Sequence, residues 1–228
     1  PTIASTSVAN GTYNVGDTVA VTITAGASET GLTLAGTFNG QTLTGITENG
    51  GGTYTGTYTV VEGDSNIADA GSVTTSITLT DAAGNASTAL TAIVLSGESI
   101  DANSPVAISS VAIPNTSMNV GDVVTVTITA SEQGLTLSGT PTIGGFTVSS
   151  LTDNSDNTYT AQFTVTEGGT DVAANASIPV SIILADAAGN TTPTFTTAIT
   201  QAGDDIDANT PTIASTSVAN GTYNVGDT

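Results

Sequence analysis

The chain has 228 residues, 20 of them Asp or Glu, and it contains no Lys, Arg, His or Cys, so its formal net charge is −20. The missing cations exclude the basic surface that nucleic acid requires, and they predict repulsion from anionic membranes. The missing His and Cys exclude Ser–His and Cys–His catalysis, disulfide bonds and thiolate zinc sites. We therefore expect neither an enzyme nor a nucleic-acid-binding protein.

Internal repeats divide the chain. Residues 1–18 recur without change at 211–228. A weaker repeat relates NVGDTVAVTITA at 14–25 to NVGDVVTVTITA at 119–130, and LTDAAGN at 79–85 to LADAAGN at 184–190. The sequence thus predicts module 1 (1–104), module 2 (105–210) and the start of a third module at 211–228, in an array that alternates two module types.

Each module is predicted to be all-β. Val19, Val21 and Ile23 alternate with Thr and Ala, a period of two that is typical of a strand with one buried face. Turn residues such as Asn-Gly separate these stretches. The strands predicted in module 1 are lettered A to G in chain order: A at 2–8, B at 18–25, C at 31–38, D at 41–46, E at 53–61, F at 72–80 and G at 87–95, and a loop is named by the two strands that it joins. Short strands at this density predict an immunoglobulin-like β-sandwich, and the repeat predicts two sandwiches joined end to end.

Disorder is the alternative for an acidic chain that is rich in Gly, Ser and Thr. It is disfavoured because hydrophobic residues make up 38% of the chain and alternate regularly. The aromatic residues of the fifth predicted strand are expected to fill the cores; they are Tyr54, Tyr58, Tyr159 and Phe163.

Two similar acidic segments join the modules, GESIDANSP at 97–105 and GDDIDANTP at 203–211. No basic side chain can pair with their carboxylates. Two carboxylates about 4 Å apart repel by roughly 4 kcal/mol at an effective dielectric constant of about 20. A metal cation is the strong partner that remains, so we predict a divalent ion at each junction.

Strand topology predicts which loops surround a junction. If strand directions alternate, the BC, DE and FG loops of one module face the AB and EF loops of the module before it. Ca²⁺ takes six to eight oxygen ligands and suits such a site better than Mg²⁺. The candidate ligands at the first junction are Asp17, Glu62, Asp64, Glu98, Asp101, Asn103, Glu132, Asp153, Asp186 and Asn190. Those at the second are Asp122, Glu167, Asp171, Asp204, Asp205, Asp207 and Asn209, while Glu29 and Asp81 hold matching places at the start of module 1.

The DAAGN segments have a second interpretation. Each could be a tight FG turn in which Asp81 or Asp186 accepts hydrogen bonds from backbone amides. On that interpretation these two acids are weaker ligand candidates than the linker acids.

The linker and turn motifs resemble a known family. IDANSP and IDANTP, each followed by a predicted sandwich with D-A-A-G-N near its last strand, resemble bacterial immunoglobulin-like repeats. They are most similar to the extender repeats of giant RTX-type adhesins of Gram-negative bacteria. The resemblance implies a Ca²⁺-rigidified stalk of an extracellular biofilm adhesin at the bacterial cell surface, exported by a type I system. It also implies that the partners are neighbouring modules of the same chain.

Other functions stay open on the sequence. A self-assembling filament or surface-layer subunit would also suit the unchanged repeat and would have other copies as partners. A glycan-binding or hydrolytic module could use the acid pair Asp204 and Asp205, although no Trp, Arg or His is present to build a sugar site. With no run of 18 apolar residues and no signal-peptide pattern, we expect no membrane-inserted segment.

Overall fold

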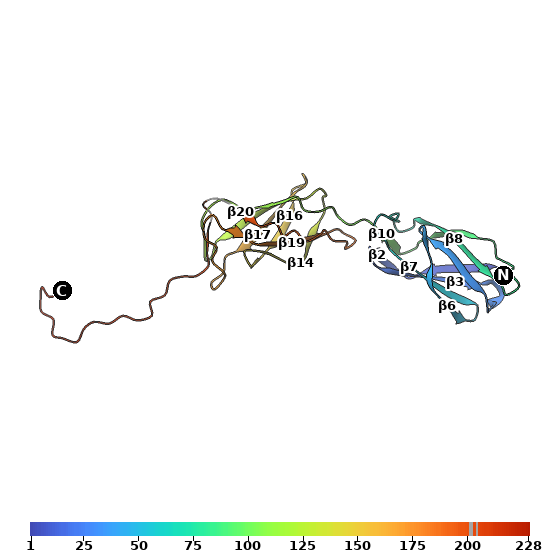
Figure 1. Ribbon diagram of the computed structural model, residues 1–228, viewed down its shortest axis with the longest axis horizontal. Coiled ribbons are helices and arrows are strands. Elements are labelled where there is room, and N and C mark those ends of the chain that lie inside the picture. Colours follow the sequence, from blue (N-terminus) through green and yellow to red (C-terminus); the bar gives the residue numbers. More distant parts are fainter. Residues whose placement is uncertain (201–202, 204) are drawn as a thin grey trace.

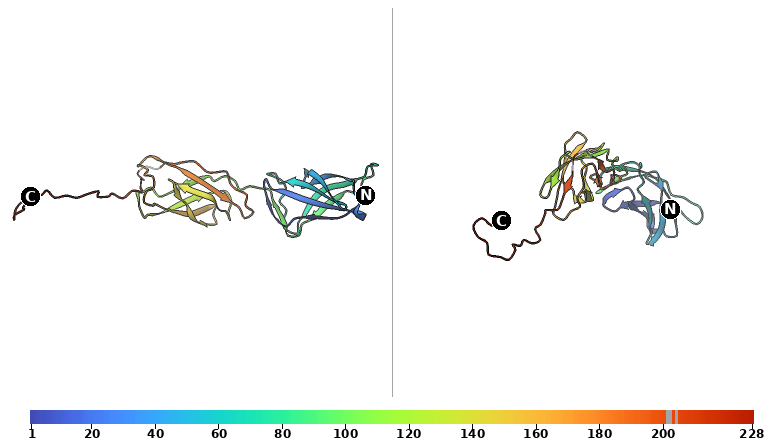
Figure 2. Two further views of the ribbon diagram at one scale, coloured as in Figure 1. Left: turned by 90° about the horizontal axis from the view of Figure 1, so that it is seen from below. Right: turned by 60° about the vertical axis from the view of Figure 1, so that its left-hand side comes forward.

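Two β-sandwiches lie end to end in the computed structural model, which describes residues 1–200, 203 and 205–228 (Figure 1). Residues 211–228 contain no helix or strand and extend from module 2 away from module 1 (Figures 1 and 2). The protein is all-β, as predicted; the only helical turn among the described residues is the 3-10 helix η1 (Gly26–Ser28).

Each module packs two antiparallel sheets face to face. In module 1 the first sheet has the order β1 (Ile3–Val8), β3 (Thr18–Ala25), β7 (Thr53–Thr59), β6 (Thr44–Gly50), and the second β5 (Gln41–Thr42), β4 (Thr33–Phe38), β8 (Ser72–Thr80), β9 (Leu90–Val94). In module 2 the first sheet is β11 (Ser110–Ala112), β13 (Val123–Thr129), β17 (Thr158–Thr164), β16 (Ser149–Asp153). Facing it are β15 (Phe146–Thr147), β14 (Thr136–Ile143) and β19 (Val180–Ala185), with the pair β18 (Ser177–Ile178) and β20 (Ile199–Thr200).

The alternation of apolar and polar residues in the sequence corresponds to an alternation of buried and exposed side chains in the strands. Val19, Val21 and Ile23 of β3 are fully buried, whereas the Thr and Ala residues between them face outward. The four aromatic residues expected in the cores are at most 1% exposed. Each module has its own apolar cluster, so each can bury its sheets without the other.

The strand predicted at 41–46 is wrong as a single element. The structure divides it into β5, which pairs with β4, and β6, which pairs with β7 in the other sheet. The chain changes sheets at Leu43, whose side chain is buried between them. Gly45, with φ +56°, then lets the backbone turn into β6.

The first half of each predicted linker is also a strand. β10 (Glu98–Asp101) pairs in parallel with β2 (Gly11–Asn14), and β21 (Ile206–Asp207) pairs in parallel with β12 (Met118–Asn119). Ile100 is buried in the core of module 1, as is Ala102. The acidic segment is therefore anchored to the module that it leaves, and only residues 103–105 lie between the two sandwiches.

Candidate metal centre at the module junction

A cleft of about 330 Å³ opens where the two modules meet. Module 1 contributes its EF loop and its outgoing chain, and module 2 contributes its BC and FG loops. Three predicted acidic ligands, Asp101, Glu132 and Asp186, line it together with Asn103. The other lining residues are Asn66, Ser104, Gln133, Gly134, Ala187 and Ala188. Asp101 and Asp186 are 85 positions apart in the sequence, yet they line the same cleft, as the predicted strand topology indicates.

Asn190 joins the modules directly. Its Oδ1 accepts a hydrogen bond of 2.8 Å from the backbone N–H of Val15, and its Nδ2 donates one of 3.2 Å to the carbonyl oxygen of Asp101. Its side chain is 4% exposed. Because both partners are backbone groups of module 1, this one amide fixes the position of the FG loop relative to the AB turn and β10.

The FG loop that carries Asn190 is a tight turn built on Asp186. Oδ1 of Asp186 accepts hydrogen bonds from the backbone N–H groups of Gly189 and Asn190, at 2.7 and 2.9 Å. Its Oδ2 accepts a third from Asn190 Nδ2, at 3.2 Å. The second interpretation of the DAAGN segment is therefore confirmed as its local role.

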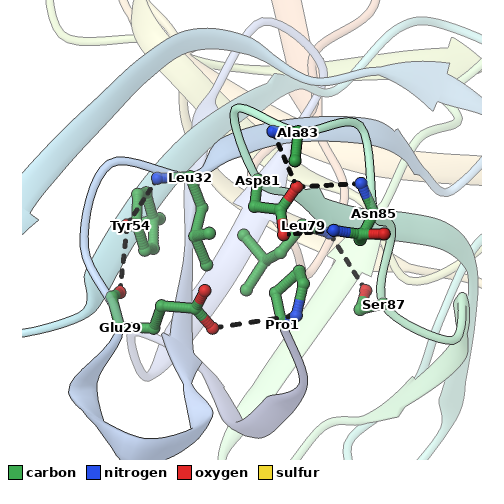
Figure 3. A network of polar contacts seen from close by, with 9 residues as sticks. All are labelled: Pro1, Glu29, Leu32, Tyr54, Leu79, Asp81, Ala83, Asn85 and Ser87. Carbon is green, nitrogen blue, oxygen red and sulfur yellow. Dashed lines mark hydrogen bonds and ion pairs between the residues drawn. The ribbon is translucent and has the colours of Figure 1, made fainter.

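The same turn forms at the other end of module 1, away from the joint. There Asp81 accepts hydrogen bonds from the N–H groups of Ala83 and Asn85 and from Asn85 Nδ2, which outweigh burial and lower its pKa (Figure 3). Glu29 lies at this end too, with its carboxylate 3.7 Å from the amino group of Pro1 (Figure 3). The DAAGN sequence therefore forms this turn in both modules, and at the joint the turn presents Asn190 to module 1.

The cleft concentrates negative charge. Burial raises the pKa of Glu132, and the charges of Asp186 and Asp101 raise it further. The chain has no Lys, Arg or His to offset them. Carboxylate and amide oxygens are the hard ligands that Ca²⁺ prefers, so the donor chemistry of the cleft fits this ion. Among the residues that the structure describes, however, no three acidic side chains are yet close enough to hold a metal together.

Several predicted ligands, together with Asn66, hold the outgoing chain in place. Both carboxylate oxygens of Glu62 accept from Ser104 N–H at 3.1 Å, and Asn66 Oδ1 accepts from Ala102 N–H and Asn103 Nδ2. Module 2 repeats the arrangement with Glu167 on Thr210, and with Asp171 on Ala208 and Asn209. Asp101 and Asp207 each accept the N–H group two residues further on. Corresponding hydrogen bonds therefore anchor the outgoing chain in both modules.

Other predicted ligands do not line the cleft. Asp64 is bound within module 1 by Gln41 and Tyr58, and Asp153 accepts the N–H group of Gly134. Asp17 and Asp122 close the AB turns by accepting from Asn14 and Asn119. Glu98 is buried along β10, where it accepts the N–H group of Ser96.

The second junction has only its first half in this chain. Asp207, Asn209 and Glu167 lie at the outgoing end of module 2, as their counterparts do in module 1. Oδ1 of Asp205 is buried and has no hydrogen-bond partner among the described residues. Asp204, the remaining predicted ligand, lies outside the described residues.

Three contributors at the joint were not predicted as such: Asn14, Val15 and Asn66. Oδ1 of Asn14 is buried and unpartnered in the described structure, and its amide faces Gly189 of the FG loop closely enough that a Cβ there would lie 2.8 Å from Nδ2. Asn14 and Val15 open the repeated segment NVGD, so the repeat itself was a signal.

Comparisons with known proteins add the following findings. No family model matches the chain, and no curated protein matches it. Among solved structures, it is similar to the fibronectin(III)-like modules of Clostridium thermocellum CbhA, with 12% identity, coverage of 90% of this chain and 94% of that one, and a TM-score of 0.37. It is similar to Yersinia pseudotuberculosis InvD, with 22% identity, coverage of 86% and 57%, and a TM-score of 0.29. The D00-D0 domain of intimin gives 11% identity, coverage of 84% and 98%, and a TM-score of 0.27.

The chain spans little more than half of the InvD structure that it matches. Within the described residues of this chain, no helix has the length and apolar character to cross a membrane.

Proposed function

We propose that the chain is an extender segment of a large secreted adhesin, a stalk whose modules are held in line by Ca²⁺ at their junctions. The observation that carries the proposal is the cleft between the modules, which gathers Asp101, Glu132 and Asp186 in a chain without a basic side chain. Ion binding would offset a repulsion that opposes docking of the two modules.

Asp101 reaches the cleft from module 1, and Glu132 and Asp186 reach it from module 2. Asn103 adds an amide oxygen, and the buried Oδ1 of Asn14 is a further oxygen beside the FG loop. A bound Ca²⁺ supplies the positive charge that these groups lack. The protein's own hydrogen bonds position the groups around the cleft. Glu62 and Asn66 hold the linker, and Asn190 connects the FG loop to Val15 and Asp101.

The test follows the amide of Val15, which is hydrogen-bonded only while the modules are docked. We expect its hydrogen-exchange protection to rise at least about tenfold on going from EGTA to millimolar Ca²⁺, and small-angle scattering to report a stiffer rod. Equal protection and equal scattering curves in the two buffers would contradict the proposal.

Two matched substitutions separate the ion site from the turn. Asp186→Asn and Asp81→Asn damage the same turn, but only Asp186 lies in the cleft. We expect Asp186→Asn alone to weaken the calcium response of Val15. Equal responses in the two variants would show that the acids of the cleft do not bind the ion.

The extracellular location and the RTX-type assignment belong to the same proposal. They are supported by the linker and turn motifs and by a composition that suits folding where calcium is abundant. Circular dichroism of the calcium-free chain at low salt tests this part, because repulsion among the carboxylates is expected to loosen the chain there. A fully cooperative native-like transition without calcium would contradict it.

A further inference from the structure

Asn66 of the EF loop lines the cleft between the modules and also holds the outgoing chain. Its Oδ1 accepts hydrogen bonds from the N–H group of Ala102 at 2.7 Å and from Nδ2 of Asn103 at 2.8 Å. The backbone N–H group of Ala102 can only donate, so the atom of Asn66 that faces it must be the amide oxygen. What Asn66 has left for the cleft is its NH2 group, which is a hydrogen-bond donor and does not bind a cation.

Asp171 holds the matching place in module 2. Its Oδ1 accepts hydrogen bonds from the N–H group of Ala208 and from Nδ2 of Asn209, each at 2.8 Å. In both modules the next residue of the loop pairs with the outgoing strand in the same antiparallel bridge. The second carboxylate oxygen of Asp171 therefore corresponds to the NH2 group of Asn66.

We propose that Asn66 lowers the calcium affinity of the joint, because it presents an NH2 group where a carboxylate oxygen would fit. This inference rests on the proposed function, in which Asp101, Glu132 and Asp186 supply the charged ligands. Ligand charge and site rigidity tune the affinity of oxygen sites for Ca²⁺, and a carboxylate at residue 66 would add a fourth negative ligand to these three. The outgoing end of module 2 has this carboxylate in Asp171, so the two outgoing ends offer different groups to a cation.

The substitution Asn66→Asp is compatible with the fold. The hydrogen bonds of Asp171 are those that a carboxylate needs in order to hold the outgoing chain. Asn66 is exposed, so the new charge is not buried. The substitution therefore changes the charge at the cleft and leaves the linker anchored.

The test titrates the full chain with Ca²⁺ and follows the amide of Val15, because its hydrogen bond to Asn190 spans the joint. We expect Asn66→Asp to lower the calcium concentration at half-maximal exchange protection by at least about tenfold. In EGTA the same variant should protect Val15 less than the unsubstituted chain does, since a fourth carboxylate adds repulsion. These opposite effects identify a charge at the ion site, because a damaged linker would lower protection in both buffers.

Two control variants fix the interpretation. Asp171→Asn makes the reverse change at the outgoing end of module 2 and should leave the titration of Val15 unchanged. Asn66→Ala removes the acceptor without adding charge and should lower protection in both buffers. If the unsubstituted chain responds to Ca²⁺ with the same midpoint as Asn66→Asp, this inference alone is overturned. If the unsubstituted chain shows no response, the proposed function is overturned and this inference with it.

Discussion

At the outgoing end of module 1 the EF loop is held by polar contacts, whereas the corresponding corner of module 2 is aromatic. Both corners occupy the same place in their own sandwich. In module 1, Tyr58 donates a hydrogen bond of 2.7 Å to Asp64 Oδ2, and Gln41 donates one of 2.7 Å to Oδ1. Asn39 completes the network by donating to the hydroxyl of Tyr58 at 3.2 Å. One carboxylate thus ties the EF loop to strands of both sheets.

In module 2 the same places are held by Phe163, Gly169, Phe146 and Gly144. The two phenyl rings stack, with centroids 5.8 Å apart and planes inclined by 12°. A Cβ at Gly169 would lie 2.5 Å from the ring of Phe146, so a carboxylate cannot be added without moving that ring. The four positions have changed as a set, and the comparison identifies Asp64 as a structural acid.

Phe163→Ala should have the largest effect. It removes a fully buried ring and half of the aromatic stack. We expect module 2 to lose about 3–5 kcal/mol of unfolding free energy while module 1 is unchanged. Residue-resolved hydrogen exchange during denaturation separates the two modules, and a loss below about 1 kcal/mol would show that the stack does not support the corner.

Asp64→Ala should cost less, about 1–3 kcal/mol, because it leaves Tyr58, Gln41 and the N–H group of Val61 without their acceptor. The reciprocal change, Gly169→Asp, should destabilise module 2, since the new side chain meets Phe146. Denaturant titration measures both. If Gly169→Asp were stabilising, the two corners would be interchangeable residue by residue.

Acid should distinguish the corners further. Burial alone would raise the pKa of Asp64, but the hydrogen bonds from Gln41 and Tyr58 outweigh it and lower the pKa below 3.8. A carboxyl group with a lowered folded pKa contributes stability above its unfolded pKa, and loses it as the pH falls through the folded value. The unfolding free energy of module 1 should therefore decrease below about pH 4, and this decrease should be absent in Asp64→Asn. If the stability of module 1 fell with pH in Asp64→Asn as it does in the unsubstituted chain, this assignment would be contradicted.

The smallest effect on stability is expected at the joint. Asn190→Ala removes hydrogen bonds to Val15 and Asp101, whereas Asn85→Ala alters the corresponding turn of module 1, at the end away from the joint. We expect Asn190→Ala to cost about 1 kcal/mol of docking free energy and to expose the Val15 amide to exchange. Asn85→Ala should leave that amide protected. Equal protection in both variants would place the joint elsewhere.

Much of the fold follows from local pattern. A period of two in Thr and Val marks β3 and β13 because one face of each strand is buried and the other is wet. The pairing of β10 was missed because Glu98 is buried where that pattern demands an apolar residue, so GESID looks like a linker. The sheet change at Leu43 was missed for a related reason, since alternation does not say which sheet a short strand joins.

The site was predictable as far as topology places loops. Asp101, Glu132 and Asp186 line one cleft because the outgoing chain of module 1 meets the BC and FG loops of module 2. Asp64 could not be distinguished from them, because its role depends on Tyr58 and Gln41 reaching it from other strands. The bridging role of Asn190 likewise depends on backbone groups of another module, which carry no sequence signal of their own.

The parallel pairing of β2 and β10 has a mechanical consequence. The chain enters module 1 through β1 and leaves it through β10, so tension along the rod draws β2 and β10 in opposite directions. Parallel strands loaded in this way are sheared, and their hydrogen bonds must break together, which slows forced unfolding. Module 1 has four residue pairs in this ladder, whereas the pairing described in module 2 has two. Under a rising load, module 2 should yield first and act as the extensible element of each repeat.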